Sequence, residues 1–78
     1  MEVIVYGREH GWGACKQLVE FLQEKKYEFV LKHVDQDRVA LSELISLGMT
    51  SVPVLKYGET LIVGFNPIET EKLYKSMV

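Results

Sequence analysis

The sequence is poor in reactive residues, with one cysteine, two prolines and two histidines among 78 residues. A single cysteine cannot close an internal disulfide bond. The N-terminal stretch MEVIVYGREH has neither the basic head nor the long apolar segment of an export signal, so we expect a reducing, cytoplasmic setting. His10, His33 and Cys15 do not have the spacing of metal ligands, so we expect no metal site.

Charge of one sign and long apolar runs are lacking as well. Nine basic residues stand against eleven acidic ones, for a net charge of -2. Without a basic patch, nucleic acid is a poor candidate partner. No apolar run approaches the ~18 residues that a membrane span needs. With 47% hydrophobic residues, the chain can form one small core, and we expect a single domain over residues 1–78 that is a monomer.

The first half of the chain alternates between strand and helix patterns. Apolar residues 3–5 predict a buried strand, residues 7–13 a glycine-rich loop, and CKQLVEFLQEK, from Cys15 onward, a helix. Residues 27–35, YEFVLKHVD, predict a second strand. Asp37 can cap a second helix that ends at Gly48. We expect the buried face of this helix to include or adjoin Val39, Leu41, Leu44, Ile45 and Leu47.

The second half predicts a hairpin and a closing helix. Residues 51–65 read as two strands around the turn YGET. Asn66 can cap the last helix, with Pro67 at its first position, and Ile68, Leu73 and Met77 as its apolar side. The order β-α-β-α-β-β-α predicts an α/β protein with a four-stranded mixed sheet and helices on both faces.

Three segments in this order resemble glutaredoxins, and especially the small redoxins that reduce ribonucleotide reductase. They are VIVYGR before the loop, TSVPVL before the hairpin and GFNP after it. The resemblance implies the thioredoxin fold and thiol–disulfide electron transfer. It also implies a protein partner such as ribonucleotide reductase or another disulfide protein. Glutathione is a second ligand that the resemblance implies, although Asn66-Pro67 replaces the acidic pair that many glutaredoxins use to bind it.

The resemblance fails at the catalytic motif. Cys15 aligns with the second, resolving cysteine of the family's Cys-x-x-Cys, and Trp12 occupies the position of the nucleophile. Aligning WGAC with the thioredoxin motif Trp-Cys-Gly-Pro-Cys also leaves the first cysteine absent. Reduction begins when an exposed thiolate attacks a disulfide, and a second thiol then resolves the product. Two functions therefore stay open. One is a thiol–disulfide redox protein with an altered motif. The other is a redox-inactive module that binds a protein through the edge from Thr50 to Val54.

Each candidate residue has two interpretations. Cys15 is either a reactive thiol or a small buried residue under the first helical turn. Trp12 is a partner-binding anchor, a ring folded over the loop, or a one-base change of a cysteine codon. His10 either activates a thiol or is a solvated loop residue, while His33 is interpreted as structural.

The resemblance also assigns roles to the remaining site residues. It implies that Pro53 follows a cis peptide bond and faces the active cysteine. Arg8 would bind a substrate carboxylate, or else be a solvated charge. Phe65 would form a platform beside the site, or else belong to the core. The substrate-binding set that the resemblance implies is Arg8, Thr50, Ser51, Val52, Pro53, Gly64 and Phe65.

Overall fold

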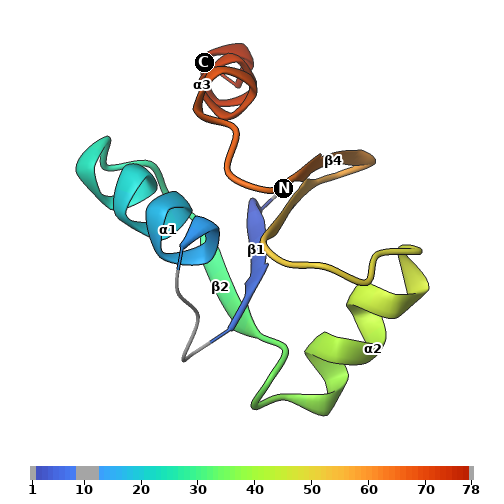
Figure 1. Cartoon of the computed structure of the whole chain (residues 1–78). Coiled ribbons are helices and arrows are strands. Elements are labelled where there is room, and N and C mark those ends of the chain that lie inside the picture. The colour runs from blue at the N-terminus through green and yellow to red at the C-terminus, as the bar shows by residue number, and fades with distance from the viewer. Residues whose placement is uncertain (1, 9–12, 78) are drawn as a thin grey trace.

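Seven helices and strands follow one another in the predicted order (Figure 1). The computed structural model describes residues 2–8 and 13–77. The elements are β1 (Ile4–Gly7), α1 (Ala14–Glu24), β2 (Val30–His33), α2 (Arg38–Ser46), β3 (Val54–Tyr57), β4 (Thr60–Val63) and α3 (Pro67–Ser76).

The four strands form one mixed sheet in the order β2-β1-β3-β4. β1 runs parallel to β2, with Ile4 opposite Val30, and antiparallel to β3. β3 and β4 form the expected hairpin, in which Tyr57 pairs with Thr60 and Gly58 has a φ of 59°. The predicted mixed sheet is confirmed, and so is the expected place of the first strand between the second and third.

Helices cover both faces of this sheet, as the sequence predicts. On one face, Leu18 and Leu22 of α1 and Tyr74 of α3 pack with Val5 and Leu55. On the other face, α2 is held by a smaller cluster centred on Leu44, Tyr6 and Val54. Figure 1 shows α1 and α2 on opposite sides of the sheet. None of the helices in the described part of the chain is long and apolar enough to cross a membrane.

The predicted caps of α2 and α3 are confirmed. The Asp37 carboxylate accepts a hydrogen bond from the Val39 N–H at 2.9 Å, and the Asn66 side chain accepts one from the Glu69 N–H at 3.1 Å. α2 stops before Gly48, whose φ of 78° lies in the left-handed region. Local capping chemistry therefore sets the boundaries of these helices.

The predicted apolar face of α2 is partly wrong. Ala40 and Leu44 are buried, but Val39 is 66% exposed, Ile45 is 60% exposed and Leu41 is exposed as well. α2 has only nine residues, and it meets the sheet through the narrow row of positions four residues apart. Apolar residues on its two flanks therefore stay in solvent.

The predicted apolar side of α3 is also wrong in part. Leu73 is half-buried, whereas Ile68 is 68% exposed and Met77 is 36% exposed. Thr70 and Tyr74, four residues apart, are the buried pair. The Tyr74 ring fixes this rotation of the helix, because its hydroxyl donates to a backbone carbonyl across the fold.

Candidate functional site

Cys15 is the second residue of α1 and lies under its first turn. The residue is only 8% exposed. The chain enters the helix through Gly13, whose φ of 68° requires glycine, and the Gly13 carbonyl accepts the Gln17 N–H at 2.9 Å. This entry directs the next residues of the helix inward, so the interpretation of Cys15 as a small buried residue is confirmed.

A cavity of about 440 Å³ lies beside Cys15 at the end of the sheet where the two parallel strands finish. Its lining includes Arg8, Cys15 and Pro53, so the structure brings together three of the predicted site residues. Lys16 and His33 line the same cavity, although the sequence analysis treated His33 as structural. The parallel register could have revealed it, because His33 lies opposite Gly7, directly before Arg8.

Pro53 closes one side of this cavity. The Val52–Pro53 peptide bond is cis, which confirms the expectation drawn from the resemblance. The Pro53 carbonyl accepts the N–H of Gly64 at 2.8 Å, and Gly64 has a φ of 78°. Gly64, the first residue after β4, is thus held against Pro53, which lines the cavity.

The backbone N–H and carbonyl of Val52 have no backbone hydrogen-bond partner in the described residues. In an antiparallel ladder, alternate residues turn both backbone groups toward the same neighbour. Leu55 and Tyr57 pair toward β4, and Val54 and Lys56 pair toward β1. Val52 itself lies two residues before β3, on the far side of the cis bond to Pro53, and is not part of either ladder. Among residues 2–8 and 13–77, no backbone group pairs with the Val52 N–H or carbonyl.

Phe65 belongs to the core rather than to an open platform. Its ring is half-buried and meets Phe21 edge to face, with ring centres 5.8 Å apart and an interplanar angle of 66°. Thr50 and Ser51, by contrast, are exposed beside Val52. Trp12 and His10 lie outside the described residues.

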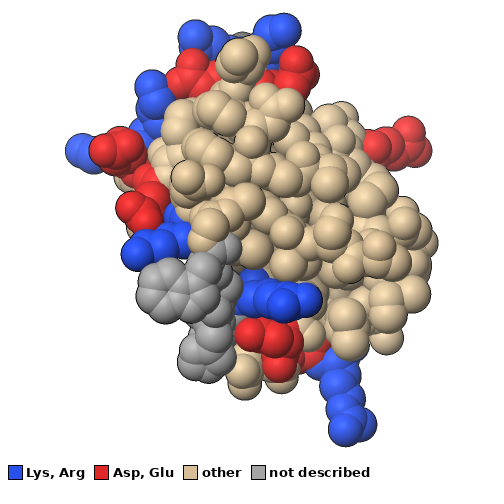
Figure 2. All heavy atoms as spheres, viewed as in Figure 1, with Lys and Arg blue, Asp and Glu red and all other residues tan. Residues whose placement is uncertain are grey.

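On the side away from the Cys15 cavity, the surface next to Val52 carries no charge over a wide area. Residues 44–55 and 60–68 contain no lysine, arginine, aspartate or glutamate. The hydrogen bond between Gly64 and Pro53 joins these two stretches. Figure 2 shows a broad uncharged surface in the middle of the view, over β4, the segment before β3 and the C-terminal part of α2. Such a surface suits an apolar partner better than a charged one.

A polar network that includes Tyr6, Lys32 and Glu43 lies on the α2 face of the sheet. Tyr6 donates to a Glu43 carboxylate oxygen at 3.0 Å, and Lys32 pairs with the same oxygen at 2.8 Å. The hydrogen bond from Lys32, followed by that from Tyr6, lowers the pKa of Glu43, while burial raises the pKa of Tyr6. These contacts tie α2 to the sheet and do not reach Cys15.

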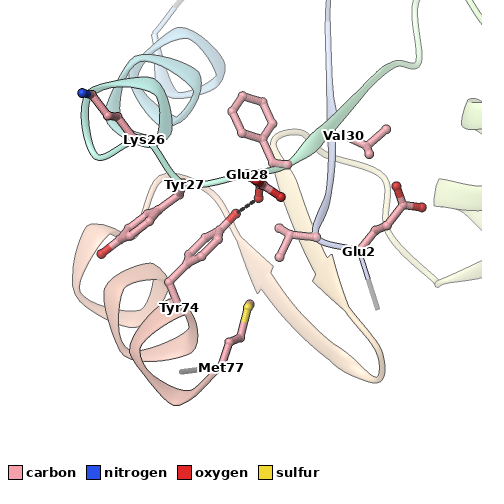
Figure 3. Close-up of a pocket in the computed structure, with 9 residues that line it drawn as sticks. Glu2, Lys26, Tyr27, Glu28, Val30, Tyr74 and Met77 are labelled. Atoms are coloured by element: carbon pink, nitrogen blue, oxygen red, sulfur yellow. Dashed lines mark hydrogen bonds between the residues drawn. The ribbon is translucent and has the colours of Figure 1, made fainter.

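A second cavity of about 440 Å³ lies at the opposite end of the sheet, beside Glu2, Val30 and Tyr74 (Figure 3). The Tyr74 hydroxyl donates to the Glu28 carbonyl at 2.7 Å. Its ring stacks on Tyr27, with centres 4.2 Å apart and an angle of 7°. Burial raises the pKa of Tyr74 to about 12. This end of the fold joins α3 to the segment between α1 and β2.

No group of three or more metal-ligating side chains occurs within the described ranges 2–8 and 13–77. Arg8 and Lys16 place positive charge at the Cys15 cavity, and Glu20 places a negative one there. The apolar residues Val5 and Leu31 line the same cavity, which can therefore accept a ligand that has both a polar or carboxylate group and an apolar group.

Comparisons with known proteins agree with this fold. The family model described as glutaredoxin matches residues 3–62. A protein from Clostridium pasteurianum, described as an uncharacterized glutaredoxin-like 8.6 kDa protein in the rubredoxin operon, is 40% identical over 60 residues. That match covers 76% of this chain and 80% of the relative.

Two solved structures superpose along most of their length. The glutaredoxin-like NrdH-redoxin from Escherichia coli gives a TM-score of 0.81 at 23% identity, over 94% of this chain and 95% of the other. A glutaredoxin from Archaeoglobus fulgidus gives 0.82 at 26% identity, over 95% and 86%. With the thioredoxin-like sheet, the cis Pro53 and Cys15 at the start of α1, these matches lead to one conclusion: the chain belongs to the glutaredoxin family.

Proposed function

We propose that this chain binds an extended segment of a partner protein at Val52, and that Trp12-Gly13-Ala14-Cys15 is an altered thiol–disulfide site. In this proposal the chain does not reduce disulfides in its present form. The observation that carries it is the backbone of Val52, which has no backbone hydrogen-bond partner among residues 2–8 and 13–77 and lies beside an uncharged surface.

An extended segment fits this edge because strand addition needs one free N–H and one free carbonyl on the same side. Val52 offers both, since neither group has a backbone partner in the described residues. A partner strand there would lie next to Pro53 and therefore beside the Cys15 cavity. Thr50 and Ser51 are exposed next to it, so their side chains would flank the bound segment.

The altered motif is the reason that we expect the chain to bind a partner without reducing its disulfides. Disulfide reduction needs two thiols, which together give two electrons and two protons to the substrate disulfide. The chain has one cysteine, and that cysteine is 8% exposed. A partner disulfide brought to Val52 would therefore meet no exposed attacking thiolate.

The uncharged surroundings favour a protein over glutathione as the ligand. Glutathione carries two carboxylates and an ammonium group, and the stretches 44–55 and 60–68 offer no charge to any of them. Arg8 could hold one carboxylate at the cavity rim. A protein segment with apolar side chains would instead pack on the uncharged residues next to Val52.

The test is binding of peptides selected from a displayed library of random 12-residue sequences. We expect selected peptides to be uncharged at their centre and to shift the Ser51 and Val52 amide signals in NMR titrations. Ser51→Glu, which puts a charge beside Val52, should weaken binding at least about tenfold. Ser42→Glu, the same change at an exposed site on α2, should not. Shifts confined to another surface, or equal binding by Ser51→Glu, would contradict the proposal.

A further inference from the structure

We propose that the outer edge of β4 is a self-association surface, where β4 of a second copy of this chain pairs antiparallel to form one continuous sheet. This proposal departs from the monomer expected from the sequence. It concerns a different edge from that of Val52 and does not depend on the proposed function.

The first step is the direction of the backbone groups of β4. Gly64 donates to Pro53, and in the same register Ile62 lies opposite Leu55 and Thr60 opposite Tyr57. Alternate residues of an antiparallel strand face the same side. The N–H and carbonyl groups of Leu61 and Val63 therefore point away from β3, at the edge of the sheet.

The second step is that β4, although short, carries no charge, proline or bulge and has no strand on its outer side among the described residues. Natural edges are blocked by charged side chains, prolines, bulges or covering segments. The strand Thr60–Val63 contains no charged residue and no proline, and Val63 is 52% exposed. Four outward backbone groups and an exposed apolar side chain remain for another strand.

The other edge of the sheet is better protected. β2 carries the charged Lys32 on its flank. At its end, the His33 carbonyl already accepts the N–H groups of Gln36 at 3.2 Å and Asp37 at 2.9 Å. Among the described residues of β2, Val30–His33, Leu31 is the one that keeps both groups directed outward, so a second strand would gain less there. The contrast between the two edges singles out β4.

The third step is that β4 is complementary to itself. A two-fold axis at Ile62 places Leu61 of each copy opposite Val63 of the other copy, which gives two equivalent pairs. Both of these residues direct their N–H and carbonyl outward, so each pair exchanges two hydrogen bonds, four in all. The exposed Val63 side chain would then pack beside Leu61 on the α2 face of the joined sheet.

Charge does not oppose this pairing. A groove of about 440 Å³ runs between β4 and α3, and its charged lining consists of Glu69 and Lys72. These two side chains form an ion pair at 3.6 Å. Two copies of the edge therefore meet with a neutral strand and a charge-balanced groove, which favours a second copy over a strongly charged partner.

The test is sedimentation equilibrium of the full chain from micromolar to millimolar concentration. We expect the mass to rise from 9.0 kDa to twice that value. Amide exchange at Leu61 and Val63 should slow as the concentration rises. Val63→Lys should raise the dimer dissociation constant at least about tenfold, because the substitution enters the interface twice. Val63→Pro, which removes only an outward N–H, should also weaken the dimer.

Val39→Lys is the matched control, since Val39 is 66% exposed on α2, and it should dimerise as the parent does. Far-UV circular dichroism checks that each variant is folded. A parent that stays at 9.0 kDa throughout would overturn the proposal. So would a dimer that survives both Val63 variants, or one without slower exchange at Leu61 and Val63. Ser51→Glu should dimerise normally, so peptide binding and self-association can fail independently.

Discussion

Replacing Tyr74 by phenylalanine removes one hydrogen bond that joins distant parts of the chain. The Tyr74 hydroxyl donates to the Glu28 carbonyl at 2.7 Å across 46 positions of sequence. The ring itself stays, with its stacking on Tyr27 at 4.2 Å. The variant thus isolates the hydroxyl, at the opposite end of the sheet from Cys15.

The expected loss follows from the burial of the two partners. An intramolecular hydrogen bond contributes a net 0.5–1.5 kcal/mol, roughly, and an acceptor left unpaired in the interior costs about 1–3 kcal/mol. Tyr74 is 8% exposed, but Glu28 is an exposed residue, so water can reach its carbonyl when the hydroxyl is gone. We therefore expect Tyr74→Phe to lower the free energy of unfolding by about 1 kcal/mol, or about 4–8 °C in Tm for a domain of this size.

Urea unfolding followed by circular dichroism measures this loss. Tyr57→Phe is the control, because Tyr57 is half-buried and its hydroxyl has no hydrogen-bond partner in the described residues. Burial also raises the pKa of Tyr74 from near 10 to about 12. The stability linked to its neutral form is present below pH 10 and is lost as the pH rises toward 12. If Tyr74→Phe unfolds like Tyr57→Phe and keeps the alkaline loss, the reasoning is wrong.

Three further predictions concern Cys15, Glu43 and Thr70. Cys15, at 8% exposure, should react with Ellman's reagent at least about tenfold more slowly in the native state than in urea, and equal rates would show an accessible thiol. Glu43, whose pKa is lowered first by Lys32, should stabilise the fold above the usual glutamate value of 4.5 and lose that effect as the pH falls below it. Acid unfolding of Glu43→Gln should therefore be less steep than that of the parent, and superimposable curves would refute the linkage. Thr70 is fully buried, and its hydroxyl has no partner in the described part of the chain. Thr70→Val should raise the free energy of unfolding by about 1 kcal/mol, whereas a loss in urea unfolding would indicate a hidden hydrogen bond.

Sequence pattern predicted the order of elements because each boundary has local chemistry. Asp37 and Asn66 cap their helices through side-chain hydrogen bonds that depend on only a few neighbouring residues. The hairpin likewise depends on Gly58 in its turn. Such features can be predicted from the local sequence without knowledge of the rest of the fold.

Tertiary contacts determine which helix residues are buried, and the sequence pattern could not predict this. Val39 and Ile45 were expected on or near the buried face, yet the buried residues of α2 are Ala40 and Leu44. In α3, the hydroxyl of Tyr74 reaches Glu28 and turns Ile68 outward. Helical periodicity shows which residues share a face, but the partner across the interface decides how wide the buried part of that face is.

Some features of the candidate site could likewise be predicted from the sequence, and others could not. The cis peptide bond at Pro53 and the place of Arg8 followed from the resemblance, and the cavity brings both to Cys15. His33 was missed because its role depends on the register of two strands rather than on its neighbours. The Val52 backbone, which lacks a backbone partner in the described residues, gives no side-chain signal in the sequence, since its pairing depends on the tertiary structure.

Reduction of insulin by dithiothreitol tests the central claim, that Cys15 is what remains of a two-cysteine site. The parent should not accelerate the reaction. In Trp12→Cys, the new thiolate can attack one sulfur of an insulin disulfide, and Cys15, three residues on, can then displace the mixed disulfide. This leaves an internal disulfide and two insulin thiols, and dithiothreitol restores the protein. We predict activity in Trp12→Cys and its loss in Trp12→Cys combined with Cys15→Ser. A parent that already reduces insulin at the rate of Trp12→Cys would contradict the account.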